Sequence, residues 1–344
     1  MEKKMNAEEV WRSLENGYWA RHAIPDDLKN VTKLINISSL AMIGKEDISI
    51  EEMRNEWETP GLNLETDTRV VFNGDDKLVG YTDVWDVSDT PVHPFVWGRV
   101  LPEYEGRGIG SAMLMWAIDR AKHAIGRVPE NARVAARAFA VSTYEPSKRL
   151  LESQGMNLIR HSWQMLIDLD DDIPAPQWPE GIALRAYNHK QDAKSLYLTE
   201  EEAFSDHWGF VPESEEEGFE RWLHHNKNDE EFDPTLWFLA MDGDEIAGAA
   251  RCRIRSWEDP DTGWVRTIFV RRAWRRKGLA LALLNHSFGE LKSRGKERAG
   301  LGVDAESLTG ATRLYEKAGM RINRQYDLYE LELRPGEEIG KENL

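Results

Sequence analysis

The sequence has one cysteine and no long apolar run. The single thiol, Cys252, excludes an intramolecular disulfide framework and a cysteine-rich metal site, and is most simply a small buried hydrophobe. No stretch approaches the ~18 apolar residues that a membrane-spanning helix requires. Residues 1–17 contain no apolar core of a secretion signal. We therefore expect a cytoplasmic protein that does not associate with a membrane.

Positive charge is also scarce. The chain has 44 Lys and Arg against 61 Asp and Glu, a net charge of −17, and such a protein repels nucleic acid and anionic lipid. His207, His224 and His225 lack a matching set of zinc ligands. The composition predicts no nucleic-acid partner and no metal.

What is present is an internal repeat. A chain of 344 residues is long enough for two domains, and two copies of one fold explain why three landmarks occur twice. The pairs are Val100–Gly110 with Val270–Ala280, Asp75–Tyr81 with Gly243–Ala249, and Ser153–Met156 with Lys317–Met320.

The boundary between the copies lies in Asp170–Gly181, where acidic residues and three prolines exclude regular structure. We predict an N-terminal domain over residues 1–172 and a proline-rich linker over 173–181. A C-terminal domain over 182–335 and a polar tail over 336–344 complete the chain.

A strand, a basic turn and a helix form the centre of the second copy. Thr267–Val270 is β-branched and aromatic, as a buried strand should be, and apolar residues recur at helical spacing from Leu281 to Leu291. The turn between them, Arg271–Gly278, is rich in Arg and ends in glycine. Free N–H groups at a helix start and a cluster of cations favour a phosphate ligand. The alternative is a solvated basic turn before an ordinary amphipathic helix.

The turn fits the pattern Gln/Arg-x-x-Gly-x-Gly/Ala, preceded by Val270, and in this it resembles the acetyl-CoA loop of the GNAT N-acetyltransferase family. Loops that bind nucleotides fit less well, because a Gly-Lys-Ser/Thr ending is missing. The resemblance implies that Phe269 and Val270 at the strand end guide the thioester and pantetheine arm. It also implies a pyrophosphate site made of Arg275, Arg276, Lys277, Gly278, Leu279 and Ala280.

The resemblance extends to the whole architecture. Strands and helices are interspersed along both copies, which favours an α+β fold, mixed α/β, over a bundle or a barrel. We expect two tandem GNAT acyltransferase folds, similar to the mycothiol-synthase type, each with a mixed, mostly antiparallel central sheet flanked by helices.

Tyr315 is the candidate general acid. Ala311–Met320 resembles the Ala-x-x-Leu-Tyr-x-x-x-Gly-Phe helix of the family, in which the hydroxyl lies near the CoA sulfur. A phenol with a pKa near 10 stays protonated at neutral pH and can donate to a departing thiolate. The alternative is a core tyrosine with a satisfied hydroxyl. The family often has Asn just before this helix; here Ser307 takes its place as a candidate contact to the CoA arm.

The first copy keeps the loop but not the acid. Gly106, Arg107, Gly108 and Gly110 repeat the glycine-rich turn, whereas Leu151 stands where the second copy has Tyr315. We predict catalysis in the second copy. The first copy is either a degenerate, structural half or a second CoA-binding domain.

The acceptor site is expected in Ala203–Phe210, which combines aromatic and polar side chains; a packed helix and loop is the alternative. The general base is unassigned among Glu202, Asp206 and a water chain. The sequence thus predicts an acetyl-CoA-dependent N-acetyltransferase in which the primary amine of a small polar molecule attacks directly and Tyr315 protonates CoA. The alternatives are a non-catalytic acyl-CoA-binding regulatory or scaffold protein and a protein-amine acetyltransferase. Its oligomeric state, monomer or homodimer, is open.

Overall fold

The computed structural model describes residues 17–170, 172–307 and 310–341, which form two compact units. Among the described residues, the N-terminal unit contains 17–160 together with Tyr326–Ile339. The C-terminal unit contains the described residues between His161 and Gln325 together with Gly340 and Lys341. The two units therefore exchange their final strands. The strand that ends the first copy, up to Asp168, belongs mainly to the C-terminal unit, and the strand that ends the second copy, up to Arg334, belongs mainly to the N-terminal unit. The division into 1–172 and 182–335 stays a prediction about the repeat, because the compact units are not continuous stretches of chain.

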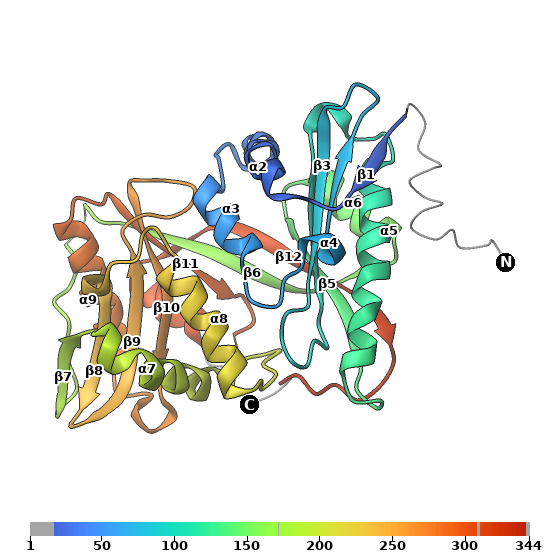
Figure 1. The fold of residues 1–344 in the computed structure, drawn as a ribbon. Helices are drawn as coiled ribbons and strands as arrows, with labels where there is room; N and C mark the ends of the chain where they lie inside the picture. Colours follow the sequence, from blue (N-terminus) through green and yellow to red (C-terminus); the bar gives the residue numbers. More distant parts are fainter. Residues whose placement is uncertain (1–16, 171, 308–309, 342–344) are drawn as a thin grey trace. The chain divides into compact units, whose positions relative to one another are not determined.

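The sheet of the N-terminal unit has the strand order β1-β2-β3-β4-β5-β12 (Figure 1). All of its described neighbours pair antiparallel except β4 and β5, which are parallel. The strands are β1 (Trp19–Arg21), β2 (Thr68–Phe72), β3 (Leu78–Trp85), β4 (Phe95–Val100), β5 (Val134–Val141) and the end of β12 (Arg321–Arg334).

The C-terminal unit repeats this arrangement in the order β7-β8-β9-β10-β11-β6. Only β10 and β11 run parallel among its described pairs. The strands are β7 (Ile182–Ala186), β8 (Trp237–Asp242), β9 (Glu245–Arg253), β10 (Thr262–Val270), β11 (Arg298–Asp304) and β6 (Asn157–Asp168). The predicted fold class, two mixed and mostly antiparallel sheets flanked by helices, is confirmed.

Helices cover both faces of each sheet. In the N-terminal unit they are α2 (Leu28–Ile43), α3 (Ile50–Trp57), α4 (Leu64–Asp67), α5 (Ile109–Ala121) and α6 (Glu145–Ser153). In the C-terminal unit they are α7 (His189–Phe204), α8 (Glu215–Lys227), α9 (Leu279–Ser293) and α10 (Ala311–Lys317). None of these described helices combines the length and the apolar character that crossing a bilayer requires.

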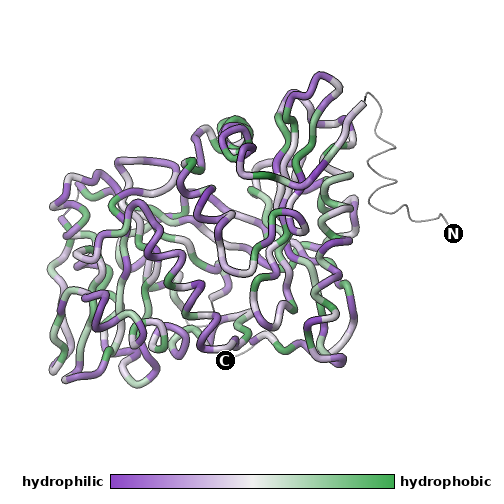
Figure 2. The backbone as a smooth tube through the Cα atoms, in the orientation of Figure 1, coloured by the Kyte–Doolittle hydropathy of each residue, from purple (hydrophilic) through white to green (hydrophobic). Residues whose placement is uncertain are grey.

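The alternation of side chains along a strand explains the two layers of helices. On β3 and β4, Gly80 and Gly98 face Met113 of α5 so closely that an added methyl group would meet its thioether. The next residue, Tyr81, points to the opposite face, where its hydroxyl accepts a hydrogen bond from the indole N–H of Trp57 in α3 at 2.9 Å. Figure 2 shows hydrophobic and hydrophilic residues alternating along the elements of both units. Each sheet thus has a buried face on either side.

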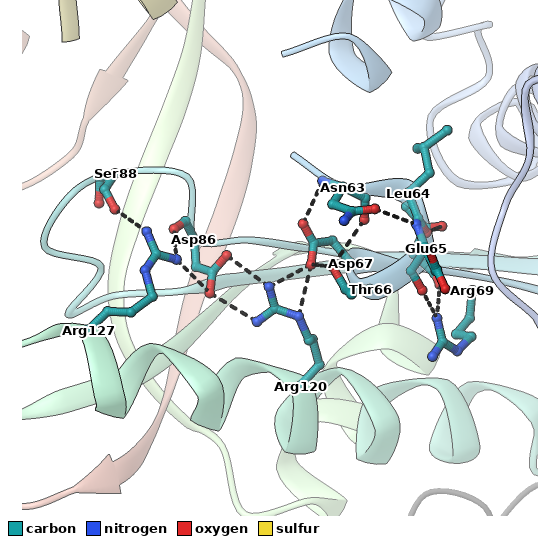
Figure 3. A network of polar contacts seen from close by, with 11 residues as sticks. Asn63, Leu64, Glu65, Thr66, Asp67, Arg69, Asp86, Ser88, Arg120 and Arg127 are labelled. Atoms are coloured by element: carbon teal, nitrogen blue, oxygen red, sulfur yellow. Dashed lines mark hydrogen bonds and ion pairs between the residues drawn. The ribbon is translucent and has the colours of Figure 1, made fainter. Parts of the chain in front are cut away.

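A buried ion network fixes α5, the helix that follows the glycine-rich loop of the N-terminal unit (Figure 3). Arg120, in the last turn of α5, donates to Asp67 at 2.5 and 2.9 Å and to Asp86 at 3.0 and 3.2 Å. Asp67 ends α4, and Asp86 follows β3. The side chains of both aspartates are at most 3% exposed. Arg127 also donates to the backbone carbonyl of Asp86. One guanidinium therefore joins a helix to two segments beside the sheet.

Candidate active site

The parallel strand pair of the C-terminal unit opens along its length. β10 pairs with β11 only at Thr262–Trp264, opposite Arg298–Gly300. Beyond that point β10 continues its antiparallel ladder with β9 as far as Val270, with a register shift that marks a β-bulge. In the described part of the chain, β10 has no further strand partner on the β11 side. The two strands therefore leave an opening whose mouth is the loop before α9.

The N-terminal unit has the same opening. β4 pairs with β5 at a single position, Phe95 opposite Arg137, so no described strand pairs with the later residues of β4 on that side. A cavity of about 760 Å³ lies here, with walls from α2, β4, the glycine-rich loop, α5, β5 and α6. Its volume is within the range of small-molecule and cofactor sites.

The loops that follow the two opened strands share one backbone conformation. A glycine with positive φ precedes each helix: Gly278 (φ 87°) before α9 and Gly108 (φ 83°) before α5. The N–H groups of residues 276–281, and likewise of residues 106–111, have no hydrogen-bond acceptor among the described residues. Unpaired amides at a helix N-terminus bind phosphate well. Both predicted loops thus present the backbone that a pyrophosphate requires.

Three cationic side chains of the C-terminal loop have different surroundings. Arg276 and Lys277 are exposed beside the free amides and form no ion pair with a described carboxylate. Arg275 instead turns inward: its guanidinium donates to Asp206 at 2.5 Å, to the carbonyl of Ala203 at 3.0 Å and to that of Val270 at 3.0 Å. Arg275 therefore anchors the loop to the end of α7, while its two neighbours remain available to phosphate.

Arg276 has a backbone conformation that favours glycine. Its φ is +62°, and Asp76 is the only other described non-glycine residue with positive φ. The equivalent residue of the first copy is Gly106, at φ +72°. We expect Arg276→Gly to raise the free energy of unfolding by about 1 kcal/mol, because a left-handed conformation costs a residue with a Cβ about that much. Urea unfolding measures the change.

Lys277→Gly is the matched control. It removes the same charge from the same exposed loop, but Lys277 does not have positive φ, so glycine there should lower stability by about 0.5 kcal/mol. Both variants should lose similar affinity for acetyl-CoA. A destabilised Arg276→Gly protein would contradict the prediction.

Asp206 anchors the loop at the mouth of the opening. Its carboxylate, 5% exposed, accepts hydrogen bonds from Arg272 and Arg275. These bonds, the one from Arg272 first, lower the pKa of Asp206 below its usual value. A carboxylate held in this way is a poor proton acceptor at neutral pH. Glu202 also forms an ion pair, with Arg271 at 2.8 Å. Also in α7, burial raises the pKa of Glu201 to about 7.

We expect Asp206→Asn to weaken acetyl-CoA binding about tenfold and to lower the free energy of unfolding by about 2 kcal/mol, because charge-assisted hydrogen bonds contribute about that much. The pKa of Asp206 is lowered on folding, so its contribution is complete above the unfolded-state pKa of about 4 and disappears as the pH falls. The stability difference between wild type and variant, measured by urea unfolding, should therefore shrink below pH 4. A difference that grew in acid would refute this role.

The segment predicted to bind the acceptor, Ala203–Phe210, is mainly part of this anchor. The ring of Phe204 packs against Phe269, with centroids 6.2 Å apart, and against His207 at 4.4 Å. Asp206 lies between them in sequence and faces the loop. The segment therefore lies against the end of β10, beside the opening.

The backbones of Phe269 and Val270 face opposite ways. The N–H of Arg271 donates to the carbonyl of Ala247 at 3.0 Å. Because antiparallel hydrogen bonds alternate, the polar groups of Phe269 point to β9 and those of Val270 point to the opening. The Val270 carbonyl accepts from Arg275, which leaves its N–H toward the opening. Of the two residues predicted to guide the thioester, only Val270 therefore directs a backbone N–H into the opening, where a ligand could accept a hydrogen bond from it.

Tyr315 lies in α10 and packs in the hydrophobic core of the C-terminal unit, 7% exposed. Burial raises the pKa of Tyr315 to about 12, so its hydroxyl is protonated at neutral pH. Among the described residues the hydroxyl has no hydrogen-bond partner. Ser307, predicted to contact CoA, lies in the turn that precedes α10, where its N–H donates to the carbonyl of Asp304 at 3.0 Å.

The structure adds two residues of the N-terminal unit that the sequence did not single out. Tyr144 precedes α6 and lines the cavity; its hydroxyl donates to Glu105 at 2.8 Å. Burial and this bond raise the pKa of Tyr144 to about 12. Arg99, on β4, lines the same cavity. The first copy has the aliphatic Leu151 at the position of Tyr315, but its cavity is nevertheless lined by a phenol, Tyr144, and a cation, Arg99.

Comparison with known proteins identifies the family to which the chain belongs. A model described as the acetyltransferase (GNAT) family matches residues 33–145 and 193–320, one stretch in each copy. Together they cover more than half of the chain, and the chain belongs to the GNAT acetyltransferase family. It is an acetyltransferase that uses acetyl-CoA as its cosubstrate. No group of three or more metal-binding side chains lies together in the described part of the chain.

Individual relatives narrow the comparison. Mycothiol acetyltransferase of Thermobispora bispora is 29% identical over 253 residues, covering 73% of this chain and 78% of the relative. Mycothiol acetyltransferase of Salinispora arenicola is 30% identical over 252 residues, 71% of this chain and 75% of that protein. A GCN5-related N-acetyltransferase from Sphaerobacter thermophilus, known as a crystal structure, is 35% identical with a TM-score of 0.75, covering 95% of this chain and 99% of the other.

A tandem GNAT protein from the clavulanic acid biosynthesis pathway shares the two-copy fold. Its TM-score is 0.67 over 93% of this chain and 100% of its own, at 14% identity. Identity at that level shows the fold alone.

Proposed function

We propose that the C-terminal unit transfers the acetyl group of acetyl-CoA directly to the primary amine of a small polar molecule, with Tyr315 as general acid. The amides of residues 276–281 hold the pyrophosphate, and Arg276 and Lys277 add positive charge around it. The opening between β10 and β11 receives the pantetheine arm along Val270.

In this mechanism the amine nitrogen attacks the thioester carbonyl carbon and the carbon–sulfur bond breaks. The departing thiolate takes the proton of the Tyr315 hydroxyl, and the nitrogen releases one proton to a base. The phenolate then recovers a proton from solvent, so amide and free CoA thiol are the products. A phenol whose pKa is about 12 is reprotonated at once at neutral pH.

The observation that carries the proposal is the row of unpaired amides at the mouth of an opened strand pair. Free amides occur at every helix start, but in both copies they follow a glycine with positive φ and lie beside an opened strand pair. This combination favours a pyrophosphate site over a solvated basic turn. The names of the relatives, mycothiol acetyltransferases, support a small-molecule acceptor.

The test is the release of CoA thiol from acetyl-CoA in the presence of a panel of small primary amines, with lysine-containing peptides as a separate arm. We expect turnover with at least one small amine. Turnover with peptides only would assign the protein to the protein-amine acetyltransferases. Binding of acetyl-CoA without thiol release in any arm would favour a regulatory, non-catalytic role.

We also propose that the N-terminal unit binds a CoA thioester, because its cavity, its opened strand pair and its row of free amides repeat those of the C-terminal unit. Calorimetric titration of the full chain should give two sites for acetyl-CoA. Ser111→Glu in α5 and Leu281→Glu in α9 place a carboxylate at equivalent positions in the first turns of the two helices, where it repels phosphate yet suits the helix dipole. Each variant should lose one site; two sites in Ser111→Glu would refute the proposal.

A further inference from the structure

Arg99 is an unpaired cation in the cavity of the N-terminal unit. It lies one residue before Val100, at the position that Phe269 has in the other copy. One of its terminal nitrogens donates to the carbonyl of Gly98 at 3.0 Å, and the guanidinium carbon lies 4.3 Å from the centroid of the Trp97 ring. Its Nε is buried without a hydrogen-bond partner. Arg99 forms no ion pair with any carboxylate in the described ranges.

The carboxyls around Arg99 leave its charge largely uncompensated. Asp47 and Asp83 act on it only from a distance, and burial, the larger effect, lowers the pKa of Arg99 below its usual value. Asp83 is itself buried, and this raises its pKa to about 7, so it is only partly ionised at neutral pH. The hydroxyl of Tyr144 is engaged by Glu105. A cation in such surroundings gains most from an anion that a ligand brings.

The position and the geometry of Arg99 indicate which kind of anion it binds. The phosphates of CoA have their own site, the free amides of residues 106–111, at the mouth of the cavity. Arg99 lies farther along β4, where the acyl end of a bound thioester or its acceptor would lie, beside the ring of Trp97, in a cavity that Met42 also lines. Of the two arginines in the lining, Arg149 is 79% exposed and lies 3.9 Å from Glu145, whereas Arg99 has its Nε buried and its guanidinium against the Trp97 ring. Such a guanidinium suits a short carbon chain that ends in a carboxylate, which an Arg side chain binds through two parallel hydrogen bonds.

We propose that Arg99 binds a carboxylate of the ligand that occupies the cavity of the N-terminal unit. The carboxylate belongs either to the acyl chain of a dicarboxylic acyl-CoA or to an amino-acid acceptor; both offer the same anion to the same side chain. The C-terminal unit has Phe269 at this position and carries no such preference. The proposal rests on the N-terminal unit taking a CoA thioester, as proposed above.

The test uses the full chain with Leu281→Glu, so that titration reports the N-terminal unit. Succinyl-CoA is compared with butyryl-CoA, which has a methyl group in place of the carboxylate. In a second arm, glycine is compared with glycinamide in the presence of CoA. We expect the carboxylate ligand of at least one arm to bind about tenfold more tightly than its neutral partner. That preference should vanish in Arg99→Met and fall in Arg99→Lys.

The arm that shows the preference identifies the source of the carboxylate. CoA that binds without a preference in either arm, or a preference that survives Arg99→Met, would overturn the role of Arg99 alone. Failure of CoA itself to bind the Leu281→Glu chain would overturn the CoA site of the N-terminal unit, and this proposal with it. Arg99→Met should fold, because it removes an unpaired buried charge, and Arg99→Lys provides a second folded variant.

Discussion

Tyr315→Phe is expected to lower kcat for acetyl transfer by about a hundredfold or more, because general acid catalysis contributes about 10²- to 10⁴-fold. The ring stays in the core and only the hydroxyl is lost. That hydroxyl has no hydrogen-bond partner among the described residues, so the free energy of unfolding should change little. The KM for acetyl-CoA should also change little, because the loop amides and Val270 are untouched. Steady-state kinetics by thiol release and urea unfolding measure the three quantities.

The pH dependence gives a second test of the same residue. Burial raises the pKa of Tyr315 to about 12, so its hydroxyl stays protonated through the usual assay range. The wild-type rate should therefore show no loss from Tyr315 ionisation below about pH 10. Tyr144→Phe in the N-terminal unit is the matched control, since it removes a phenol with a similarly raised pKa. If Tyr315→Phe kept full kcat while Tyr144→Phe lost it, the chemistry would belong to the other unit.

Arg120→Met should lower the free energy of unfolding by about 3–5 kcal/mol, the cost of leaving buried charges without their partner. The change leaves the carboxylate of Asp67, 2% exposed, without a cation, and leaves that of Asp86, 3% exposed, with only the ion pair to the exposed Arg127 at 3.3 Å. Asp67 keeps bonds from the N–H of Asn63 and the hydroxyl of Thr66, but these do not supply a positive charge. Thermal or urea unfolding of the full chain measures the loss.

Arg127→Met is the control within the same network (Figure 3). Arg127 also pairs with Asp86, at 3.3 Å, but its side chain is 44% exposed, so its loss should cost less than about 1 kcal/mol. Adding Asp67→Asn and Asp86→Asn to Arg120→Met should recover part of the loss, because the uncompensated charges are then gone. Equal effects of the two arginine changes would show that burial does not decide the strength of this network.

The sequence predicted the strand, loop and helix of both copies because that signal is local. Periodicity located the strand that ends at Val270 and the helix that begins at Leu279, and the glycine pattern located the turn. Both glycines before the helices do have positive φ, and the free amides follow from the start of a helix whatever the side chains are.

The anchor of the loop was not predictable in the same way. Arg275 and Asp206 are 69 residues apart in sequence, and a motif that counts Arg275 among the phosphate contacts does not reveal that its guanidinium points inward. Arg99 and Tyr144 were missed for a related reason. The repeat aligns Leu151 with Tyr315, whereas Tyr144 lies seven residues earlier, before the helix that carries the family pattern. Pro146, two residues after Tyr144, signals the start of α6 and could have placed Tyr144 at the end of the loop before that helix.

The exchange of final strands has a consequence for how the protein is made. Residues up to Arg160 leave the ribosome first, yet their sheet lacks its last strand until Tyr326–Arg334 has been translated. During that interval β5 exposes an unpaired edge, the kind of surface that promotes misassembly with other chains. A protease cut in the linker, or a fragment that stops there, would release neither unit intact.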